Sequence, residues 1–249
     1  MRPASVGFQC PECVAEGART QRAARTVAGG RVPRNPGRAT MVLIGLNVVV
    51  FLLVLGTGGG SSRLALDFVM LPESWPRLGL TGVDDGAWWR LLTSAFLHTQ
   101  VLHIALNMIA LYALGPALER LVGHGHFVAV YLTTALAGSV TVLWLGGPRD
   151  FTLGASGAVF GIFGAAIVLM RSRGYDIQSL AVVLGINLVL TFTLDVISWQ
   201  AHLGGLVTGL VLGAVLAYTP RARRRLVHPA VFAATTVLLL GLVGLHVAV

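Results

Sequence analysis

The stretch GASGAVFGIFGAA, residues 154–166, decides the fold because it combines a long apolar run with small residues four positions apart. Gly157 and Gly161, at this spacing, are typical of membrane helices whose backbones pack closely against a neighbour. Ser156 lies at the start of the same run, directly after a short charged loop. Two interpretations of Ser156 follow: a small residue that lets two helices touch, or a nucleophile.

The composition of the whole chain indicates a membrane protein. Of its 249 residues, 55% are apolar and 11% are charged, and the mean hydropathy is +0.78. A water-soluble globule needs a more highly charged surface than this composition can provide. We therefore predict an all-α, polytopic membrane helical bundle. Its seven spans are expected near residues 41–56, 99–118, 127–146, 155–170, 178–197, 200–218 and 229–249.

The formal charge of +8 is carried by arginine without lysine, and the placement of these arginines predicts the orientation of the spans. With the N-terminus in the cytoplasm, fourteen arginines fall in the tail and inner loops, and four fall outside, at positions 63, 77, 90 and 149. Because translocation leaves arginine on the cytoplasmic side, we expect a cell-membrane protein with an extracytoplasmic C-terminus. No basic face is left for nucleic acid. We interpret the all-arginine usage as bacterial.

Residues 1–40 form the predicted cytoplasmic basic tail. The first apolar run begins at Met41, so we expect an uncleaved anchor rather than a signal peptide, and residues 14–40 are typical of a flexible linker. Cys10 and Cys13, at CxxC spacing, are half of a tetrahedral zinc site, and a reducing cytoplasm argues against a disulfide. Either this half-site is orphaned, or a second chain or upstream residues complete a zinc site.

Four polar residues of the predicted spans fall at one depth. His103 and Asn107 lie one helical turn apart in the second span, Ser156 opens the fourth, and His202 opens the sixth. In the expected topology the even-numbered spans all run inward, so all four residues lie near the outer surface. Polar groups in hydrocarbon tend to face the bundle interior. We therefore expect the four side chains to converge there.

This convergence favours a nucleophilic serine. The fourth span is short, roughly 24 Å against a hydrocarbon core of about 30 Å, so residues 147–154 are predicted to be non-helical and to border a wet cavity. His202 is the candidate base. His103 and Asn107, with the backbone N–H of the serine, are candidate donors to an oxyanion. Asp195 is left as an alternative third member of a catalytic triad, but an arrangement of serine and histidine alone is favoured.

The packing interpretation is compatible with this chemistry. Gly157 in the fourth span, and Gly205 and Gly209 in the sixth, are small residues suited to close helix contact. Packing these two spans together is what would bring Ser156 to His202.

Together, the motifs resemble the rhomboid family of intramembrane serine proteases. The matching segments are, in chain order, Trp89-Arg90 in the long loop at 57–97, HTQVLHIALN at 98–107, GASG at 154–157 and AHLGGLVTG at 201–209. The resemblance covers about residues 41–218 and implies a rhomboid-like six-helix core there. A basic loop and a seventh, C-terminal transmembrane helix follow over residues 219–249.

The resemblance also implies a role for each matching residue. Ser156 attacks the scissile carbonyl, His202 is general base and then general acid, and His103 and Asn107 hold the oxyanion. Phe160 stands where bacterial relatives often carry a tyrosine that stacks on the histidine, so its ring is expected to stack without a hydroxyl. Further matching positions are expected to support the site or the first loop: Gly154, Gly157, Gly205, Trp89, Arg90, His98 and Glu119.

The leading hypothesis is an intramembrane endopeptidase that hydrolyses peptide bonds in or near transmembrane segments of substrate proteins in the lipid bilayer. It requires no cofactor, and no metal is expected in the core, where His124 and His126 are interpreted as solvated residues of a short inner loop. The alternative is a non-proteolytic relative that binds transmembrane helices. Because both Ser156 and His202 are present, the enzyme is favoured. The sequence does not predict an oligomeric state.

Overall fold

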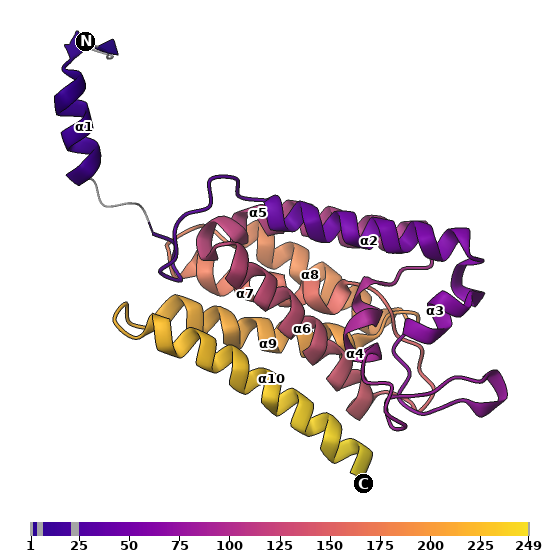
Figure 1. Cartoon of the computed structure of the whole chain (residues 1–249). Coiled ribbons are helices and arrows are strands. Elements are labelled where there is room, and N and C mark those ends of the chain that lie inside the picture. The colour runs from indigo at the N-terminus through magenta and orange to yellow at the C-terminus, as the bar shows by residue number, and fades with distance from the viewer. Residues whose placement is uncertain (1, 4–6, 21–24, 249) are drawn as a thin grey trace.

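The computed structural model describes residues 2–3, 7–20 and 25–248, and it consists mainly of a bundle of apolar helices (Figure 1). Five of the described helices are long and apolar enough to cross a membrane, and two further apolar helices, α7 and α8, have 16 residues each. The predicted all-α, polytopic bundle is confirmed. These seven helices are α2 (Arg38–Gly56), α5 (Val101–Val122), α6 (His124–Leu145), α7 (Ser156–Arg171), α8 (Gln178–Thr193), α9 (Trp199–Tyr218) and α10 (Arg224–Ala248).

Short elements occupy the tail and the first loop. In the tail, two antiparallel strands, β1 (Arg2–Pro3) and β2 (Phe8–Gln9), are followed by α1 (Pro11–Thr20). The loop between α2 and α5 contains short helical pieces. These pieces are η1 (Gly59–Ser61), α3 (Arg63–Phe68), η2 (Pro76–Leu78), α4 (Arg90–Thr93) and η3 (Ser94–Phe96).

The helices α6, α7 and α9 form the centre of the bundle, because glycines let their backbones touch. A Cβ added at Gly205 of α9 would collide with the carbonyl group of Gly157 in α7. From the α6 side, a Cβ at Gly138 would lie 2.9 Å from the carbonyl oxygen of Ala201. Close contact between small residues is a main source of helix association in membranes. The glycine contacts therefore hold α6, α7 and α9 against one another at the depth where α7 and α9 begin.

Glu119, near the end of α5, joins three helices. Its buried carboxylate accepts the backbone N–H groups of Ala39 and Thr40 at the start of α2, both at 3.1 Å, and the Thr40 hydroxyl at 2.9 Å. It also contacts the imidazole of His124, the first residue of α6. A negative group is favourable at a helix N-terminus. Glu119 thus holds the start of α2 against the end of α5.

The prediction of a flexible linker over residues 14–40 is wrong in two places. The helix α1 continues through Thr20, and Val27 and Ala28 are buried beside the bundle. The backbone N–H of Val27 donates to the carbonyl of Leu121 at 2.8 Å. Composition did not reveal this docking, because two apolar residues among arginines and glycines give no periodic signal, yet they are enough to bury apolar surface against the end of α5.

The last helix, α10, lies along one side of the bundle, away from α2 (Figure 1). The sequence places His124 and His126 in a solvated loop, whereas the structure places both in the first turn of α6. The His126 ring packs edge-on against His228 of α10, with ring centroids 5.3 Å apart. Towards the other end of α6, Trp144 Nε1 donates to the carbonyl of Leu242 at 3.2 Å. These contacts attach α10 to both ends of α6.

Candidate active site

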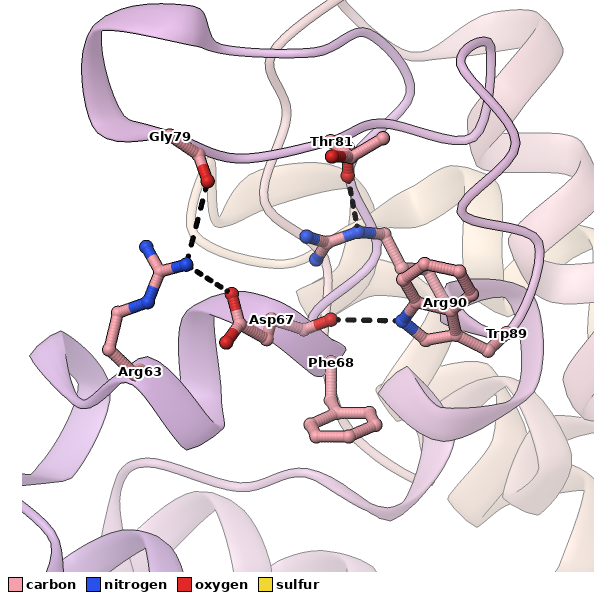
Figure 2. Close-up of a pocket in the computed structure, with 7 residues that line it drawn as sticks. All are labelled: Arg63, Asp67, Phe68, Gly79, Thr81, Trp89 and Arg90. Atoms are coloured by element: carbon pink, nitrogen blue, oxygen red, sulfur yellow. Dashed lines mark hydrogen bonds and ion pairs between the residues drawn. The ribbon is translucent and has the colours of Figure 1, made fainter.

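The long first loop is held by Arg90, which is 1% exposed although it carries a charge. Burial lowers the pKa of its guanidinium from the ordinary value. Beside it, Trp89 Nε1 donates to the carbonyl of Asp67 at 3.1 Å, and both side chains line a cavity of about 320 Å³ (Figure 2). The Arg90 nitrogens donate, at 2.7 Å each, to the backbone carbonyls of Thr81, Leu66 and Val69. These bonds tie α3 and the rest of the loop to α4, which leads into the candidate site.

A tight turn before α7 positions Ser156. Gly154 has a φ of +117°, a conformation that side-chain-bearing residues rarely adopt. A Cβ at this position would also lie only 2.6 Å from the His103 ring. The backbone N–H of Gly154 donates to the carbonyl of Ser94 at 2.9 Å. The backbone is therefore fixed two residues before Ser156, which is half-buried and begins the helix.

His98, in the connection before α5, supports the same turn. Its Nε2 accepts the backbone N–H of Ala155 at 3.3 Å, and its ring packs edge-on against His103 with centroids 5.0 Å apart. Burial, together with the nearby His103, lowers the pKa of His98 to about 3. The imidazole is therefore uncharged at neutral pH, and its lone pair can accept the N–H group. His98 contacts the backbone that leads into Ser156 rather than the serine side chain.

His202 lies in the first turn of α9 and is 8% exposed. The ring of Phe160, one turn beyond the serine in α7, stacks on the imidazole with centroids 4.1 Å apart and an interplanar angle of 18°. Phe160 therefore supplies the expected stacking ring, without the hydroxyl group that a tyrosine would carry. On α8, Thr191 Oγ1 lies 2.7 Å from His202 Nδ1. Two neighbouring helices thus contact this imidazole.

His103 and Asn107 come from α5, one helical turn apart. Asn107 is buried, and its Nδ2 donates to the carbonyl of His103 at 2.9 Å. The His103 ring lies against Gly154, as described above. The start of α5 therefore contributes two polar side chains beside the turn that precedes Ser156.

Backbone contact brings the starts of α7 and α9 together. A Cβ at Gly157, the residue after Ser156, would lie 3.2 Å from the carbonyl oxygen of Ala201, the residue before His202. Among the described residues, no hydrogen bond joins the Ser156 hydroxyl to His202, whose Nδ1 instead contacts Thr191. Catalytic hydrogen bonds are often long without substrate and tighten when it binds.

A small cavity of about 20 Å³, with a mainly apolar lining, lies beside the backbone on either side of Ser156. Its lining includes the glycines on either side of Ser156, Gly154 and Gly157, and three hydroxyl-bearing residues, Ser94, Ser139 and Thr152. A cavity of this size has room for about one water molecule, which needs polar partners such as these hydroxyl groups. The predicted non-helical segment at 147–154 forms one wall of it through Thr152, Leu153 and Gly154.

Other sequence candidates lie elsewhere. Asp195 is exposed beyond the end of α8, and a threonine rather than a carboxylate contacts His202 Nδ1. Cys10 and Cys13 are exposed at the start of α1, and the described residues contain no group of three or more potential metal ligands. Zinc binding by the tail stays a prediction. Sequence reasoning missed Thr191, although a threonine inside an apolar span was a visible signal; which helix it faces could not be read from the sequence.

A bundle of membrane-crossing helices, with polar side chains gathered where three of them begin, defines a polytopic membrane protein with a buried polar site. A family model described as the Rhomboid domain matches residues 85–219, which is more than half of the chain. The chain belongs to the rhomboid family and is a multi-pass membrane protein.

Named relatives come from bacteria, plants and fungi. The chain is 32% identical over 182 residues to the "Rhomboid protease GluP" of Bacillus subtilis, covering 71% of this chain and 34% of GluP. It is 33% identical over 137 residues to YdcA of the same bacterium, covering 53% of this chain and 68% of YdcA. To the "Rhomboid-type serine protease 2" of Emericella nidulans it is 32% identical over 146 residues, covering 55% of this chain and 28% of that protein. The chain thus spans about a third of GluP, and the range of sources does not single out a bacterial origin.

Proposed function

We propose that this chain is an intramembrane serine endopeptidase in which Ser156 is the nucleophile and His202 its base. The observation that carries the proposal is the backbone contact between Gly157 and Ala201, which brings the helix starts that bear the two residues together. Two relatives that are identical to this chain at about a third of the aligned positions are named as a rhomboid protease and a rhomboid-type serine protease. These names support the same chemistry here.

In the proposed reaction, Ser156 Oγ bonds to the scissile carbonyl carbon while His202 Nε2 takes the hydroxyl proton. His103 and Asn107 donate hydrogen bonds to the oxyanion that forms. The imidazolium then gives its proton to the leaving amine as the carbon–nitrogen bond breaks. A water molecule, activated in turn by His202, hydrolyses the acyl-enzyme and restores the serine. This sequence uses groups of the chain and water alone.

We infer that the substrates are transmembrane segments of other proteins, and that the site opens towards the extracytoplasmic side. Glu119, at the end of α5, caps the start of α2, so the tail meets the bundle at the opposite end from His103, at the start of α5. A cytoplasmic tail, as the arginine distribution predicts, then puts the site at the outer end. Reporter fusions at the C-terminus, which is predicted to lie outside, test this orientation.

Labelling by a fluorophosphonate tests the proposed nucleophile. We expect wild-type protein in detergent to be labelled and Ser156→Ala, which lacks the attacking oxygen, to be unlabelled. His202→Ala should lose at least a hundredfold in labelling rate, because a general base contributes about 10² to 10⁴ in rate. Ser172→Ala is the matched control, since this serine caps the opposite end of the same helix and its hydroxyl donates to the carbonyl of Leu169. It should label like the wild type.

Equal labelling of all four proteins would contradict the assignment of Ser156. Absence of labelling in a folded wild type that still captures a transmembrane peptide would support the alternative, a non-proteolytic protein that binds transmembrane helices. Cleavage of a model transmembrane substrate by wild type and by Ser172→Ala, but not by Ser156→Ala, completes the test.

A further inference from the structure

Thr191 makes two short contacts with one hydroxyl group. Its Oγ1 donates to the carbonyl of Asn187, four residues earlier in α8, at 2.7 Å, and lies 2.7 Å from Nδ1 of His202. The residue is 3% exposed, so water does not replace either partner. Among the described residues, this contact is the hydrogen bond that joins α8 to the candidate catalytic histidine.

The hydroxyl has a single hydrogen, and this fixes the direction of both bonds. A carbonyl oxygen can only accept, so the hydrogen that points to Asn187 is not available to His202. Threonine in a membrane helix commonly forms this bond to the carbonyl one turn earlier. The oxygen lone pairs of Thr191 then face Nδ1, which must carry a hydrogen to complete the second bond. A neutral imidazole has only one N–H group, so its Nε2 is left bare.

We propose that Thr191 is a positioning residue that holds His202 in the tautomer with Nδ1 protonated, so that Nε2 is free to take the proton of Ser156. This inference rests on the proposed function of the dyad and deepens it. The hydrogen bond made by one ring nitrogen decides which nitrogen is protonated. In this chain a neutral hydroxyl takes the place that a carboxylate has in a triad.

The location of Thr191 makes the tautomer depend on α8. Among the 16 residues of this helix, all of which the structure describes, Leu184 and Thr191 are the buried ones. The stacking ring of Phe160 comes from α7 and contacts the face of the imidazole, so it orients the plane without selecting a nitrogen. Selection of the nitrogen therefore comes from α8, a helix whose other residues are half-buried or exposed.

The test compares Thr191→Val, which has the same shape without the hydroxyl, with Thr191→Ser, which keeps the hydroxyl. Thr193→Val is the matched control, because Thr193 in the same helix also bonds a carbonyl one turn earlier, at 2.9 Å, but is exposed. Nitrogen-15 NMR of histidine-labelled protein reads the tautomer, and the His202 signal is the one lost in His202→Gln. Cleavage of a model transmembrane peptide gives kcat and KM.

We expect wild type, Thr191→Ser and Thr193→Val to show His202 protonated on Nδ1 and to share one kcat. Thr191→Val should shift His202 towards the other tautomer and lower kcat about tenfold, the effect of one hydrogen bond of about 1 to 1.5 kcal/mol, with KM unchanged. A wild-type histidine protonated on Nε2 overturns the proposal, as does a Thr191→Val protein that matches Thr193→Val in tautomer and kcat. If the tautomers behave as expected but the wild type is neither labelled nor active, the positioning role stands and the protease assignment fails.

Discussion

The helices α7 and α8 have the same length and similar apolar composition, yet they occupy different environments. Each has 16 residues, but most of α7 is buried, whereas α8 buries Leu184 and Thr191. The difference follows the glycines. Those of α7 meet backbone or side-chain atoms of α6 and α9, whereas Gly185 of α8 has no neighbouring atom within 4 Å of its added Cβ. Small residues produce tight packing only when a second helix offers a matching surface.

This difference divides the proposed chemistry between a tightly held and a loosely held helix. Ser156 lies on α7, whose position is fixed by backbone contacts, while the partner of the base, Thr191, lies on α8. Segments with few buried apolar contacts open at lower free-energy cost than a packed core. Changes in the α7–α9 contact should therefore affect folding and activity together, whereas changes at the α8 contact should affect activity with little loss of stability.

The largest effect is expected from Gly205→Ala. The new methyl group would collide with the Gly157 carbonyl, which belongs to the backbone and cannot rotate away, so α7 and α9 must separate. We expect unfolding in detergent to require about 3 kcal/mol less free energy, the upper part of the usual cost of overpacking, and cleavage to be lost. Thermal and denaturant unfolding of the purified protein measure the first quantity.

Gly185→Ala is the control for that change, because it adds the same methyl group to α8 in open space. Alanine is the better helix former, by up to about 1 kcal/mol, so stability should stay equal or rise slightly. Equal destabilisation by both substitutions would mean that the two helices are packed alike, and the comparison between them would be wrong.

The next effect is expected at His98, which supports the start of α7. In His98→Ala the N–H of Ala155 loses its acceptor in a buried place, which costs about 1 to 3 kcal/mol. The pKa of His98 is lowered by burial to about 3, from an ordinary value near 6.5. The unfolded chain therefore binds a proton first as the pH falls, and the stability contributed by the neutral ring is complete above about 6.5 and is lost towards 3.

His98→Gln separates the pH effect from the packing effect, because glutamine offers an oxygen acceptor that does not titrate in this range. The stability of wild type relative to His98→Gln should decrease as the pH falls from about 6.5 towards 3. The other titratable ring against His98 is His103, which is present in both proteins. A stability difference that does not change with pH would show that His98 is not kept neutral by the fold.

Much of this arrangement could be predicted from the sequence, because hydrophobic runs and small-residue spacing act locally. The seven apolar helices, and the positions of Ser156 and His202 at helix starts, follow from such patterns. Two kinds of feature could not be predicted from such patterns. The docking of Val27 depends on a few contacts without periodicity, and the pairing of Thr191 with His202 depends on how two helices are rotated about their axes. Apolar residues all round a membrane helix leave that rotation undetermined.

The smallest effect is expected at Phe160, which separates the roles of α7 and α8 at His202. Phe160 contacts this imidazole from α7, while Thr191 contacts it from α8. Phe160→Leu keeps apolar volume but removes the stacked ring, worth about 0.5 to 1.5 kcal/mol, so kcat should fall about two- to tenfold without a change of tautomer. Phe160→Tyr keeps the ring and should retain kcat. If Phe160→Leu instead shifted the His202 nitrogen-15 signals as Thr191→Val is expected to do, the two contacts would have the same role, and selection of the nitrogen could not be assigned to α8 alone.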